Sequence, residues 1–392
     1  IAGAAIFNGN VGIGTTTPTS KLALAGGNFT HTAAGNPTLT GTYNTSGNAY
    51  SVYTSGKYTY LADLSFGLQI IDISNPAVPT LIGAYDTSGS AYDVYVSGKY
   101  AYIAGDTSGL QIIDISNPKV PSLTGTYNTS GNATGVYVSG EYAYVADSSS
   151  GLQIIDISNP AAPTLAGTYD TSGSAAGVYV SGKYAYVADN TVGLQIIDIS
   201  NPAAPTLSGT YANAGTVIDV YVSGKYAYVS IYSTGLYIID ISNPAAPTFV
   251  NNYDTTGGAR GAYISGKYAY VADATSGLQI IDISNPAVPT LTGTYDTSGS
   301  VRGVYISGKY AYVADDTSGL QIIDINGIET PSLYAGNINT NALTVTENAD
   351  IGNSLYVRTN LNVGQGGIFT DGALTVAATS SSSYFAGALG IG

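Results

Sequence analysis

The sequence lacks several residue types on which many catalytic and metal sites depend. Among its 392 residues there is no Cys, no Met and no Trp, and His31 is the only histidine. Disulfides and Cys/His zinc sites are therefore excluded, and a catalytic triad that needs histidine is nearly excluded as well. We expect no bound cofactor, with calcium between acidic loops as the alternative, and we assign no role to His31.

Charged residues are also scarce, and one sign dominates. Lys and Arg number 11 against 25 Asp and Glu, which gives a net charge of -14. Such a surface repels phosphate backbones, so nucleic acid is not an expected partner. No apolar run reaches the roughly 18 residues that a membrane-spanning helix needs, so we predict no transmembrane segment. The lack of oxidisable Cys and Met, together with many Ser and Thr, favours an extracellular or cell-surface location.

The abundant residues are typical of strands joined by tight turns. The chain has 50 Gly and 35 Tyr, and 44% of its residues are hydrophobic, which is enough to bury a sizeable core. Most of the apolar residues are Val, Ile, Leu, Ala and Tyr, and Ser and Thr are abundant beside them. We therefore predict an all-β protein.

A unit of 42 residues recurs seven times without insertion. Each copy contains Ser-Gly-Lys-Tyr, or Ser-Gly-Glu-Tyr in one case, beginning at Ser55, Ser97, Ser139, Ser181, Ser223, Ser265 and Ser307. Each unit holds four strand-like runs, which in the sixth copy are GAYISG, KYAYVAD, GLQIIDI and PTLTGTYD. The central runs are apolar at odd and even positions, so both faces of each sheet are expected to be buried. This pattern predicts a seven-bladed β-propeller with four-stranded blades.

The ends of the repeat region favour a closed ring over an open solenoid. Residues 36–47 hold a fourth run without the first three, and the last copy loses the pattern at Asn326. A ring in which an N-terminal strand, residues 37–44, completes the final blade explains both ends; the tail fragment PSLYAG is the alternative for that strand. The predicted domains are an N-terminal stem at 1–35, a propeller at 36–326 and a C-terminal stem at 327–392.

The repeat resembles a known family. The stretch GLQIIDISNPAAPTLAGTYDTSGSAAGVYVSGKYAYVAD is similar to the LVIVD repeat, a motif of bacterial and archaeal extracellular proteins expected to form β-propellers. The resemblance covers residues 36–326. It implies a fold and a surface location but no reaction, because propellers host unrelated functions.

The flanks follow a different pattern. GNVGIGTTTPTSKLAL, residues 9–24, resembles stem repeats of tail-fibre-like and bacterial surface-fibre proteins, and the C-terminal flank offers short alternating rungs. A disordered linker is the alternative. A three-chain stem and strand exchange between subunits both bury such rungs, so copies of the same chain are the expected partners, in a homo-oligomer or filament. The candidate assembly residues are Val11, Ile13, Leu22, Leu24, Leu343, Val345, Leu355, Val357, Leu361, Val363, Leu374, Val376, Leu389 and Ile391.

Repeated aspartates are expected on both faces of the ring. One face is predicted to be acidic, with Asp86, Asp170, Asp254 and Asp296 from inter-blade loops and Asp63, Asp147, Asp189, Asp273 and Asp315 from the Val-Ala-Asp ends. The other face carries the Ser-Gly turns with their Lys residues and the aspartates of the Ile-Ile-Asp runs. A residue that recurs in every blade usually serves the blade, so we predict that the Ile-Ile-Asp carboxylates cap turns or pair with Lys.

Ligand binding is predicted where the repeat is broken. Just before the Val of the first strand, the residues differ from copy to copy. The fifth copy also carries a tyrosine, Tyr232, at a position where the other copies have none. The candidate ligand-binding residues are Tyr50, Tyr92, Asp93, Asp219, Tyr232, Arg260 and Arg302. Arg with exposed Tyr suits a carbohydrate or carboxylate ligand, while neutral drift in permissive loops is the competing explanation. A carboxylate pair for glycoside hydrolysis, Asp93 with Asp219, is a further option.

These observations lead to three functional hypotheses in order of preference. The first is a structural subunit of an extracellular fibre or surface appendage, which displays the propeller as a lateral interaction module and self-assembles through its termini. The second is a glycan-binding adhesin or receptor-binding fibre that uses the channel mouth. The third is a carbohydrate-active enzyme, which we do not expect because no constellation of nucleophile, base and metal is visible.

Overall fold

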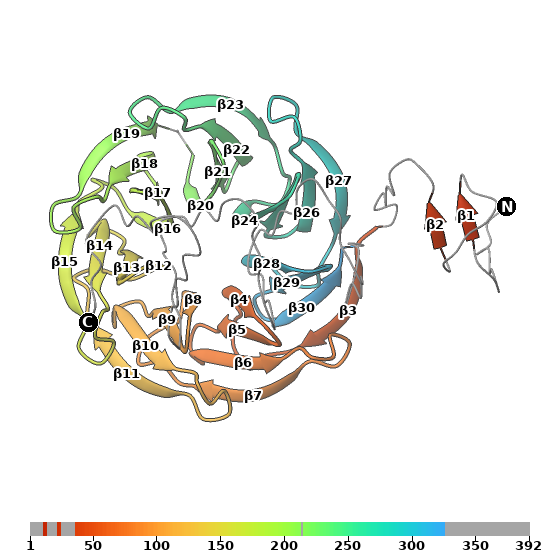
Figure 1. Cartoon of the computed structure of the whole chain (residues 1–392), viewed down its shortest axis with the longest axis horizontal. Coiled ribbons are helices and arrows are strands. Elements are labelled where there is room, and N and C mark those ends of the chain that lie inside the picture. Colours follow the sequence, from red (N-terminus) through yellow and green to blue (C-terminus); the bar gives the residue numbers. More distant parts are fainter. Residues whose placement is uncertain (1–10, 14–21, 25–35, 213–214, 326–392) are drawn as a thin grey trace, which may run out of the picture. The chain divides into compact units, whose positions relative to one another are not determined.

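Each of the first six repeats folds into one antiparallel sheet of four strands, the seventh repeat supplies three strands of such a sheet, and the seven sheets are arranged in a ring (Figure 1). The computed structural model describes residues 11–13, 22–24, 36–212 and 215–325. In six sheets the strands follow one another in sequence from the centre of the ring outward, and in the seventh the outermost place is taken by β3. The all-β class and the seven-bladed propeller are therefore confirmed. Below, blade 1 comprises β4 to β7, and the numbering follows the chain to blade 7.

The strands at equivalent places in the blades have similar bounds. The innermost strands are β4 (Ser51–Ser55), β8 (Asp93–Ser97), β12 (Gly135–Ser139), β16 (Ala175–Ser181), β20 (Val217–Ser223), β24 (Ala259–Ser265) and β28 (Gly303–Ser307). The second strands are β5 (Tyr58–Ala62), β9 (Tyr100–Ala104), β13 (Tyr142–Ala146), β17 (Tyr184–Asp189), β21 (Tyr226–Ile231), β25 (Tyr268–Asp273) and β29 (Tyr310–Ala314). The third strands are β6 (Leu68–Asp72), β10 (Leu110–Asp114), β14 (Leu152–Asp156), β18 (Gly193–Asp198), β22 (Gly235–Asp240), β26 (Gly277–Asp282) and β30 (Leu320–Asp324). The outermost strands are β7 (Thr80–Tyr85), β11 (Ser122–Tyr127), β15 (Thr164–Tyr169), β19 (Thr206–Ala212), β23 (Thr248–Tyr253), β27 (Thr290–Tyr295) and β3 (Thr38–Tyr43).

The hydrophobic core lies between the blades rather than within one of them. Ile112 and Ile113 are neighbours on β10 and both are fully buried. Ile112 packs with residues of blade 3, whereas Ile113 packs with residues of blade 1. Successive side chains of a strand point to opposite faces, so a strand sandwiched between two blades must be apolar at every position. This explains why the central runs do not alternate between apolar and polar residues.

The ring is closed by β3, which pairs with β30 and completes blade 7. The register joins Thr38 to Asp324 and Tyr43 to Leu320. This strand contacts blade 1 in the same way as the outermost strands of other blades contact the blade that follows them. A Cβ atom at Gly41 of β3 would lie 2.1 Å from the carbonyl oxygen of Pro76, so the loop of the next blade passes directly over the glycine. The alternative fragment PSLYAG lies outside the described residues.

Buried carboxylates tie the inter-blade loops to the blades, and this corrects one expectation. The Val-Ala-Asp aspartates were predicted to contribute to an acidic face, but their side chains are 0% exposed: Asp63, Asp147, Asp189, Asp273 and Asp315. Asp147 accepts hydrogen bonds from Thr129 Oγ1 at 2.6 Å and from the Gly131 backbone N–H at 2.8 Å. Burial raises the pKa of Asp147, although these two contacts and one from Ser150 oppose the rise. The carboxylate therefore holds the loop that enters blade 3, and it does not face solvent.

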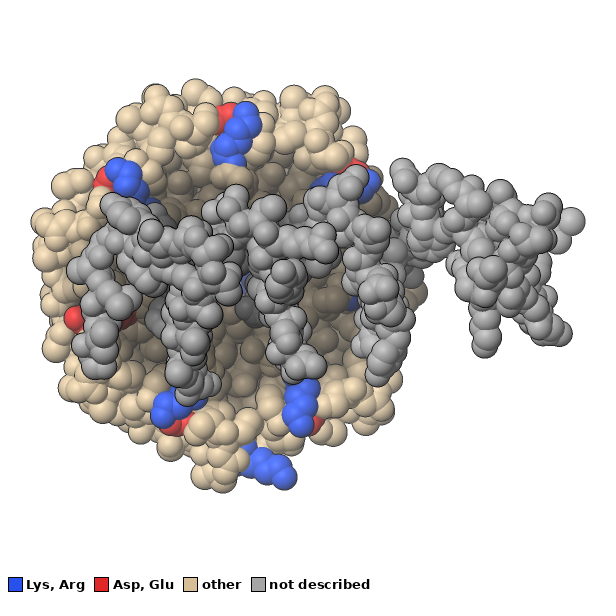
Figure 2. Space-filling model, viewed as in Figure 1, with Lys and Arg blue, Asp and Glu red and all other residues tan. Residues whose placement is uncertain are grey.

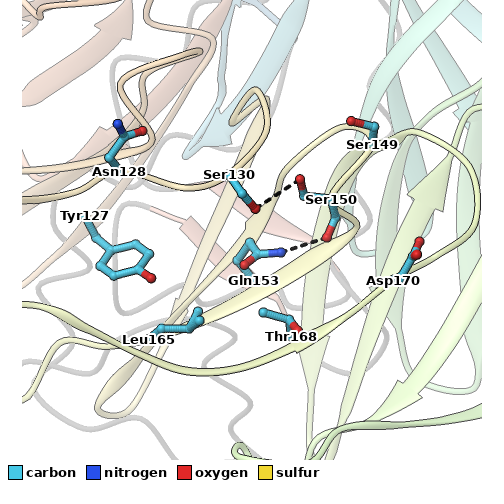
Figure 3. A pocket seen from close by; sticks show the side chains of 9 residues that line it. All are labelled: Tyr127, Asn128, Ser130, Ser149, Ser150, Gln153, Leu165, Thr168 and Asp170. Atoms are coloured by element: carbon cyan, nitrogen blue, oxygen red, sulfur yellow. Dashed lines mark hydrogen bonds between the residues drawn. The ribbon is translucent and has the colours of Figure 1, made fainter.

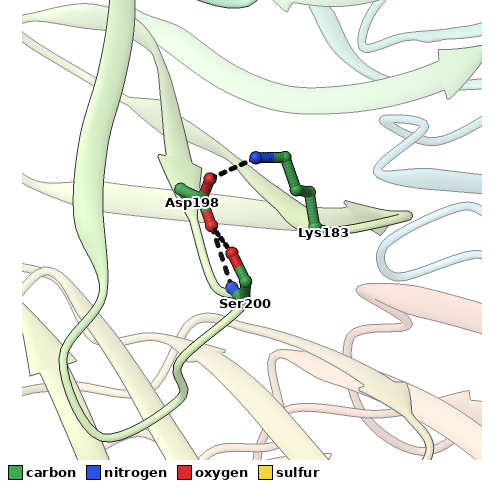
Figure 4. A network of polar contacts seen from close by, with 3 residues as sticks. All are labelled: Lys183, Asp198 and Ser200. Atoms are coloured by element: carbon green, nitrogen blue, oxygen red, sulfur yellow. Dashed lines mark hydrogen bonds and ion pairs between the residues drawn. The ribbon is translucent and has the colours of Figure 1, made fainter.

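The aspartates that end the third strands have the role expected of them. Asp198 Oδ1 accepts a hydrogen bond from the Ser200 backbone N–H at 2.9 Å, and Oδ2 lies 2.7 Å from Lys183 Nζ (Figure 4). The Lys183 ammonium and the Ser200 groups lower the pKa of Asp198 to about 2. Lys183 also lies over the ring of Tyr184, 4.9 Å from its centroid. Similar pairs recur around this face of the ring, where Figure 2 shows Lys side chains with acidic neighbours.

Part of the N-terminal flank is also described. The short strands β1 (Val11–Ile13) and β2 (Leu22–Leu24) pair in parallel, with Val11 opposite Leu22 and Ile13 opposite Leu24. The other candidate assembly residues lie outside the described residues: Leu343, Val345, Leu355, Val357, Leu361, Val363, Leu374, Val376, Leu389 and Ile391.

Candidate functional site

The positions at which the repeat is broken come together in one cavity at the mouth of the channel. The cavity measures about 280 Å³. Its lining includes six of the seven candidate ligand-binding residues, namely Tyr50, Tyr92, Asp93, Asp219, Arg260 and Arg302. The seventh, Tyr232, does not line the cavity, but its ring centroid lies 4.9 Å from Cζ of Arg260. Residues separated by as many as five blades in the sequence thus share a single site.

Three layers of side chains follow one another down the channel from this mouth. The mouth layer consists of Tyr50, Tyr92, Thr134, Ala176, Ile218, Arg260 and Arg302. The carboxylate layer, one residue further along each chain segment, consists of Ser51, Asp93, Gly135, Gly177, Asp219, Gly261 and Gly303. The tyrosine ring, two residues further again, consists of Tyr53, Tyr95, Tyr137, Tyr179, Tyr221, Tyr263 and Tyr305.

Arg302 is held rigidly at the mouth. Its Nη2 and Nε atoms lie 2.6 Å and 3.0 Å from Oδ2 of Asp316, and Asn48 donates to the other carboxylate oxygen. Burial raises the pKa of Asp316, but the contacts with Asn48 and Arg302 outweigh it and keep the pKa below its usual range. The guanidinium also lies over Tyr50, 5.4 Å from the ring centroid, and Tyr50 meets Tyr92 edge to face. Because only one edge of Arg302 is used by Asp316, the group is oriented but not saturated with hydrogen bonds.

Arg260 is less fully engaged than Arg302. It stacks on Tyr232, and its Nε atom is buried without a hydrogen-bond partner among the described residues. An arginine carries five N–H donors, and a buried donor without an acceptor is costly. Arg260 lines the mouth cavity, and its Nε atom is itself buried.

The two aspartates of the carboxylate layer clamp neighbouring blades. Asp93 accepts hydrogen bonds from the backbone N–H groups of Val94 in its own blade and Val136 in the next, each at 2.9 Å. Ser51 Oγ donates to the same carboxylate at 2.6 Å. Burial raises the pKa of Asp93, although these three donors oppose the rise.

Asp219 repeats this arrangement with fewer donors. The backbone N–H groups of Val220 and Ala262 hydrogen-bond to it. Its pKa is raised to about 7, mainly by burial and further by the negative charge of Asp93, while the two N–H groups oppose the rise. A carboxyl group with such a pKa at a cavity is typical of functional sites. The pair that sequence analysis proposed is thus close enough for one charge to influence the other.

The tyrosine ring narrows the channel below the carboxylate layer. Its neighbouring ring centroids lie between 4.8 and 5.2 Å apart around the whole circle. Hydrogen bonds connect Tyr137 with Tyr95 and Tyr179, and burial is the main reason why the pKa of Tyr95 and of Tyr179 is raised. Tilted aromatic pairs at such distances are favourable. A second cavity of about 270 Å³ is lined by all seven tyrosines, and Asp93 and Asp219 line both cavities.

A larger hollow between blades 2 and 3 is less specific. It measures about 420 Å³ and is lined mainly by residues of the repeated framework, including Tyr127, Gln153 and Thr168 (Figure 3). Gln153 Nε2 donates to the carbonyl oxygen of Ser150 at 2.7 Å, a contact that glutamines of other blades also make. Because its polar groups already serve the blade, we do not assign a ligand to this hollow.

Two components of the site were not predicted from the sequence. The tyrosine ring is visible in the sequence as one Tyr per repeat on the first strand, but identical residues were interpreted as framework. Asp316 and Asn48, which orient Arg302, lie in loops of different blades, and only the closed ring brings them together.

In the described parts of the chain, no group of three or more His, Asp or Glu side chains is placed to hold a metal ion. Over the same residues, no helix combines the length and apolar character required to cross a membrane.

Solved β-propellers resemble this fold at low sequence identity. The computationally designed Ika8 protein has a TM-score of 0.56 at 7% identity, and the match covers 74% of this chain and 99% of that one. The β-propeller domain of Myceliophteria thermophila Cps50 (Swd1) has a TM-score of 0.61 at 12% identity, over 74% of this chain and 99% of the other. The WD40 domain of Neurospora crassa Pan2 has a TM-score of 0.59 at 12% identity, over 74% and 95%. These likenesses concern the fold alone.

The comparison of sequences is more specific. Among curated proteins, none matches this chain. The LVIVD repeat matches seven consecutive segments, at residues 46–87, 88–129, 130–171, 172–213, 214–255, 256–297 and 298–335. Because these segments make up most of the sequence and coincide with the blades, the chain belongs to the LVIVD-repeat family.

Proposed function

We propose that this protein is an extracellular binding and display protein whose propeller takes a glycan at the channel mouth. One observation carries this proposal: six residues that break the repeat line a single cavity in an otherwise repetitive ring. Equivalent positions of the seven blades meet at the mouth whatever residues occupy them, so the kinds of residue found there support binding, and not their position alone. Here two arginines, two aspartates and two tyrosines converge on the same space.

The chemistry of the cavity suits a sugar. Arg260 and Arg302 provide donors for hydroxyl or carboxylate oxygens, and the rings of Tyr50 and Tyr92 provide apolar surface beside them. The volume of about 280 Å³ fits a small polar group rather than an extended chain. We propose that no cofactor takes part, and that the site binds without turnover because backbone N–H groups engage both carboxylates.

The test is a glycan array probed with the whole chain. We expect selective binding that is lost in Arg260→Ala and Arg302→Ala. Lys183→Ala, which removes a cation on the face of the Ser-Gly turns, is the matched control and is expected to bind like the wild type. An array without signal, or equal signal from all four proteins, would remove the channel mouth from consideration.

A glycoside hydrolase is a second candidate, favoured by the pKa of about 7 for Asp219. A carboxyl group that stays protonated near neutral pH can act as a general acid beside an ionised partner. Release of reducing sugar from a bound glycan, abolished in Asp219→Asn, would establish this activity. Binding of an intact glycan without release would support the binding module instead.

We further propose that the propeller is carried on a fibre built from copies of this chain. The parallel pairing of β1 with β2 supports this, because a hairpin would pair the two strands antiparallel, whereas successive rungs of a stem can pair in parallel. Residues 11–13 and 22–24 are the first two rungs of the proposed stem. Electron microscopy of the purified chain is expected to show filaments with regularly spaced lateral propellers. Dispersed single rings would contradict the fibre while leaving the binding proposal intact.

A further inference from the structure

The inner edge of the propeller presents a repeated pair of backbone donors. On each first strand, the residue after the carboxylate layer turns its N–H away from the second strand and into the channel. In blade 2 this N–H is that of Val94, which donates to Asp93 at 2.9 Å. The equivalent N–H of Val136 in blade 3 donates to the other oxygen of Asp93, also at 2.9 Å. Two adjacent N–H groups thus form a cradle that fits one carboxylate.

The same cradle is filled again between blades 5 and 6. There the N–H groups of Val220 and Ala262 bind the carboxylate of Asp219. Seven blades supply seven such N–H groups, and the two aspartates take four of them. The three remaining groups belong to Val52, Val178 and Val304.

Only blades 7 and 1 retain a complete cradle without a carboxylate. Val304 pairs with Val313 and Val52 with Leu61, in the register by which Val94 pairs with Ile103, so their N–H groups also face the channel. No side chain of residues 36–212 and 215–325 is seen to accept a hydrogen bond from either group. Val178 stands apart, because its neighbour in the next blade, Val220, is already bound to Asp219.

The residue at the centre of this cradle is Gly303, where the filled cradles have aspartate. A Cβ atom built on Gly303 would lie 3.2 Å from the carbonyl oxygen of Tyr50 and 3.7 Å from the backbone nitrogen of Val52, so a side chain at this position would lie beside that N–H. The nearby Ser51 hydroxyl is already directed to Asp93. Val52, Gly303 and Val304 all line the mouth cavity, so the cradle is open to a ligand.

We propose that this cradle binds the carboxylate of an acidic sugar, in the manner in which Asp93 and Asp219 occupy the equivalent sites. This inference rests on the proposed binding function and specifies its ligand as a carboxylate-bearing glycan such as a uronate. Arg302 precedes Gly303 in the chain and Arg260 lines the same cavity, so two guanidinium groups lie near the proposed anion, in a cavity that Asp93 and Asp219 also line. Backbone N–H pairs and arginine are the donors that recognise carboxylates in proteins.

The test compares three ligands with three forms of the whole chain by isothermal titration calorimetry. The ligands are glucuronate, glucose as its neutral counterpart, and acetate as a carboxylate without a sugar. The proteins are the wild type, Gly303→Asp, which supplies the cradle with an internal carboxylate, and Gly303→Ala, which leaves it open. We expect the wild type to bind glucuronate about tenfold or more tightly than glucose or acetate, since charged hydrogen bonds to the cradle are lost with glucose. Gly303→Asp should weaken glucuronate binding by a similar factor, and Gly303→Ala should retain most of it.

The outcomes separate this inference from the function on which it rests. Equal affinity for glucuronate and glucose, or undiminished glucuronate binding by a folded Gly303→Asp variant, would overturn the cradle and leave a neutral-glycan site. Acetate that binds as tightly as glucuronate would show a carboxylate site that does not read the sugar, and would overturn the acidic-glycan assignment. Absence of all saccharide binding would defeat both proposals. If Gly303→Asp does not fold, a crystal structure of the wild type with glucuronate decides whether the carboxylate lies between the Val304 and Val52 N–H groups.

Discussion

Two layers of the same channel, separated by two residues along each first strand, differ in their regularity. The tyrosine ring has the same residue in all seven blades, and each ring packs on its two neighbours. The carboxylate layer has Ser, Asp or Gly at the same seven strands, and its two aspartates share the available donors unequally. In the tyrosine ring every blade contributes the same side chain, and the contacts continue around the whole ring. In the carboxylate layer the blades contribute different residues, and the cavity that they line is asymmetric and charged.

An odd number of blades sharpens this difference. One carboxylate bridges the N–H groups of two neighbouring blades, so three such carboxylates would occupy six of the seven N–H groups and leave one over. Such clamps therefore cannot be distributed evenly around the ring. The chain uses two clamps rather than three, and Gly303 leaves the third pair of donors open. Asymmetry at the mouth therefore follows from a few substitutions on a constant frame.

The largest effect is expected from breaking the frame where it closes. Removal of residues 1–44 deletes β3 and exposes the edge of β30, so the free energy of unfolding should fall by roughly 5 kcal/mol as the ladder bonds of one strand are lost. Removal of residues 1–35 retains β3 and is the matched control. Chemical denaturation of both truncated chains gives the comparison. Equal stabilities would show that another segment can complete blade 7.

A smaller effect is expected from a framework carboxylate. Asp147→Ala leaves the buried Thr129 hydroxyl and Gly131 N–H without their acceptor, and should lower the free energy of unfolding by about 2–3 kcal/mol. The exposed Asp170, whose side chain caps a turn by accepting from the Ser172 N–H, is the control, and Asp170→Ala should cost about 0.5 kcal/mol. Urea unfolding at pH 7 measures both. A similar small loss for the two variants would mean that Asp147 does not hold the loop.

The carboxylate layer should make the free energy of unfolding depend on pH. Asp219 has a folded-state pKa of about 7 against an ordinary value of 3.8, so between these values the folded protein holds a proton that the unfolded chain has lost. Its contribution to stability is therefore undiminished below pH 4 and falls as pH rises to 7. Asp219→Asn should remove about 2 kcal/mol of that fall, less than the full shift implies because the channel admits water. Urea unfolding of both proteins from pH 4 to pH 8 tests this, and parallel profiles would contradict the raised pKa.

The features that sequence could predict are those that every blade repeats. The 42-residue spacing, the doubly apolar strands and the lone fourth run at residues 36–47 were enough for a seven-bladed ring, and substitutions before the first-strand Val located the mouth. The fate of the Val-Ala-Asp aspartates was not predictable in this way. Asp147 looks like a surface turn residue until the inter-blade loop folds over it and places Thr129 beside it.

The cradle could not be predicted from residue types, because it is formed by backbone N–H groups. In the sequence, Gly303 is one more small residue at a variable position. Its role as an unfilled cradle is seen only when the structure aligns it with Asp93 and Asp219 at the equivalent positions of other blades. The N–H groups of Val52 and Val304 belong to strands at opposite ends of the propeller sequence. Only ring closure makes them neighbours, so the site could not be derived before the fold.

The smallest expected effect concerns the face of the Ser-Gly turns, where blade 3 alone has Glu141 in place of lysine. In other blades the lysine lies near the aspartate that ends the third strand, as Lys225 lies 3.1 Å from Asp240. Glu141 stands where the other blades have lysine and cannot form such a pair with Asp156. Glu141→Lys should therefore supply the missing ion pair and raise the melting temperature by on the order of one degree, because exposed pairs contribute little. Calorimetry in low and high salt checks the origin, since the gain should shrink as salt screens it. A loss of stability would show that Glu141 stabilises blade 3 through a contact that lysine cannot make. Blade 3 would then differ functionally from the other blades on this face as well.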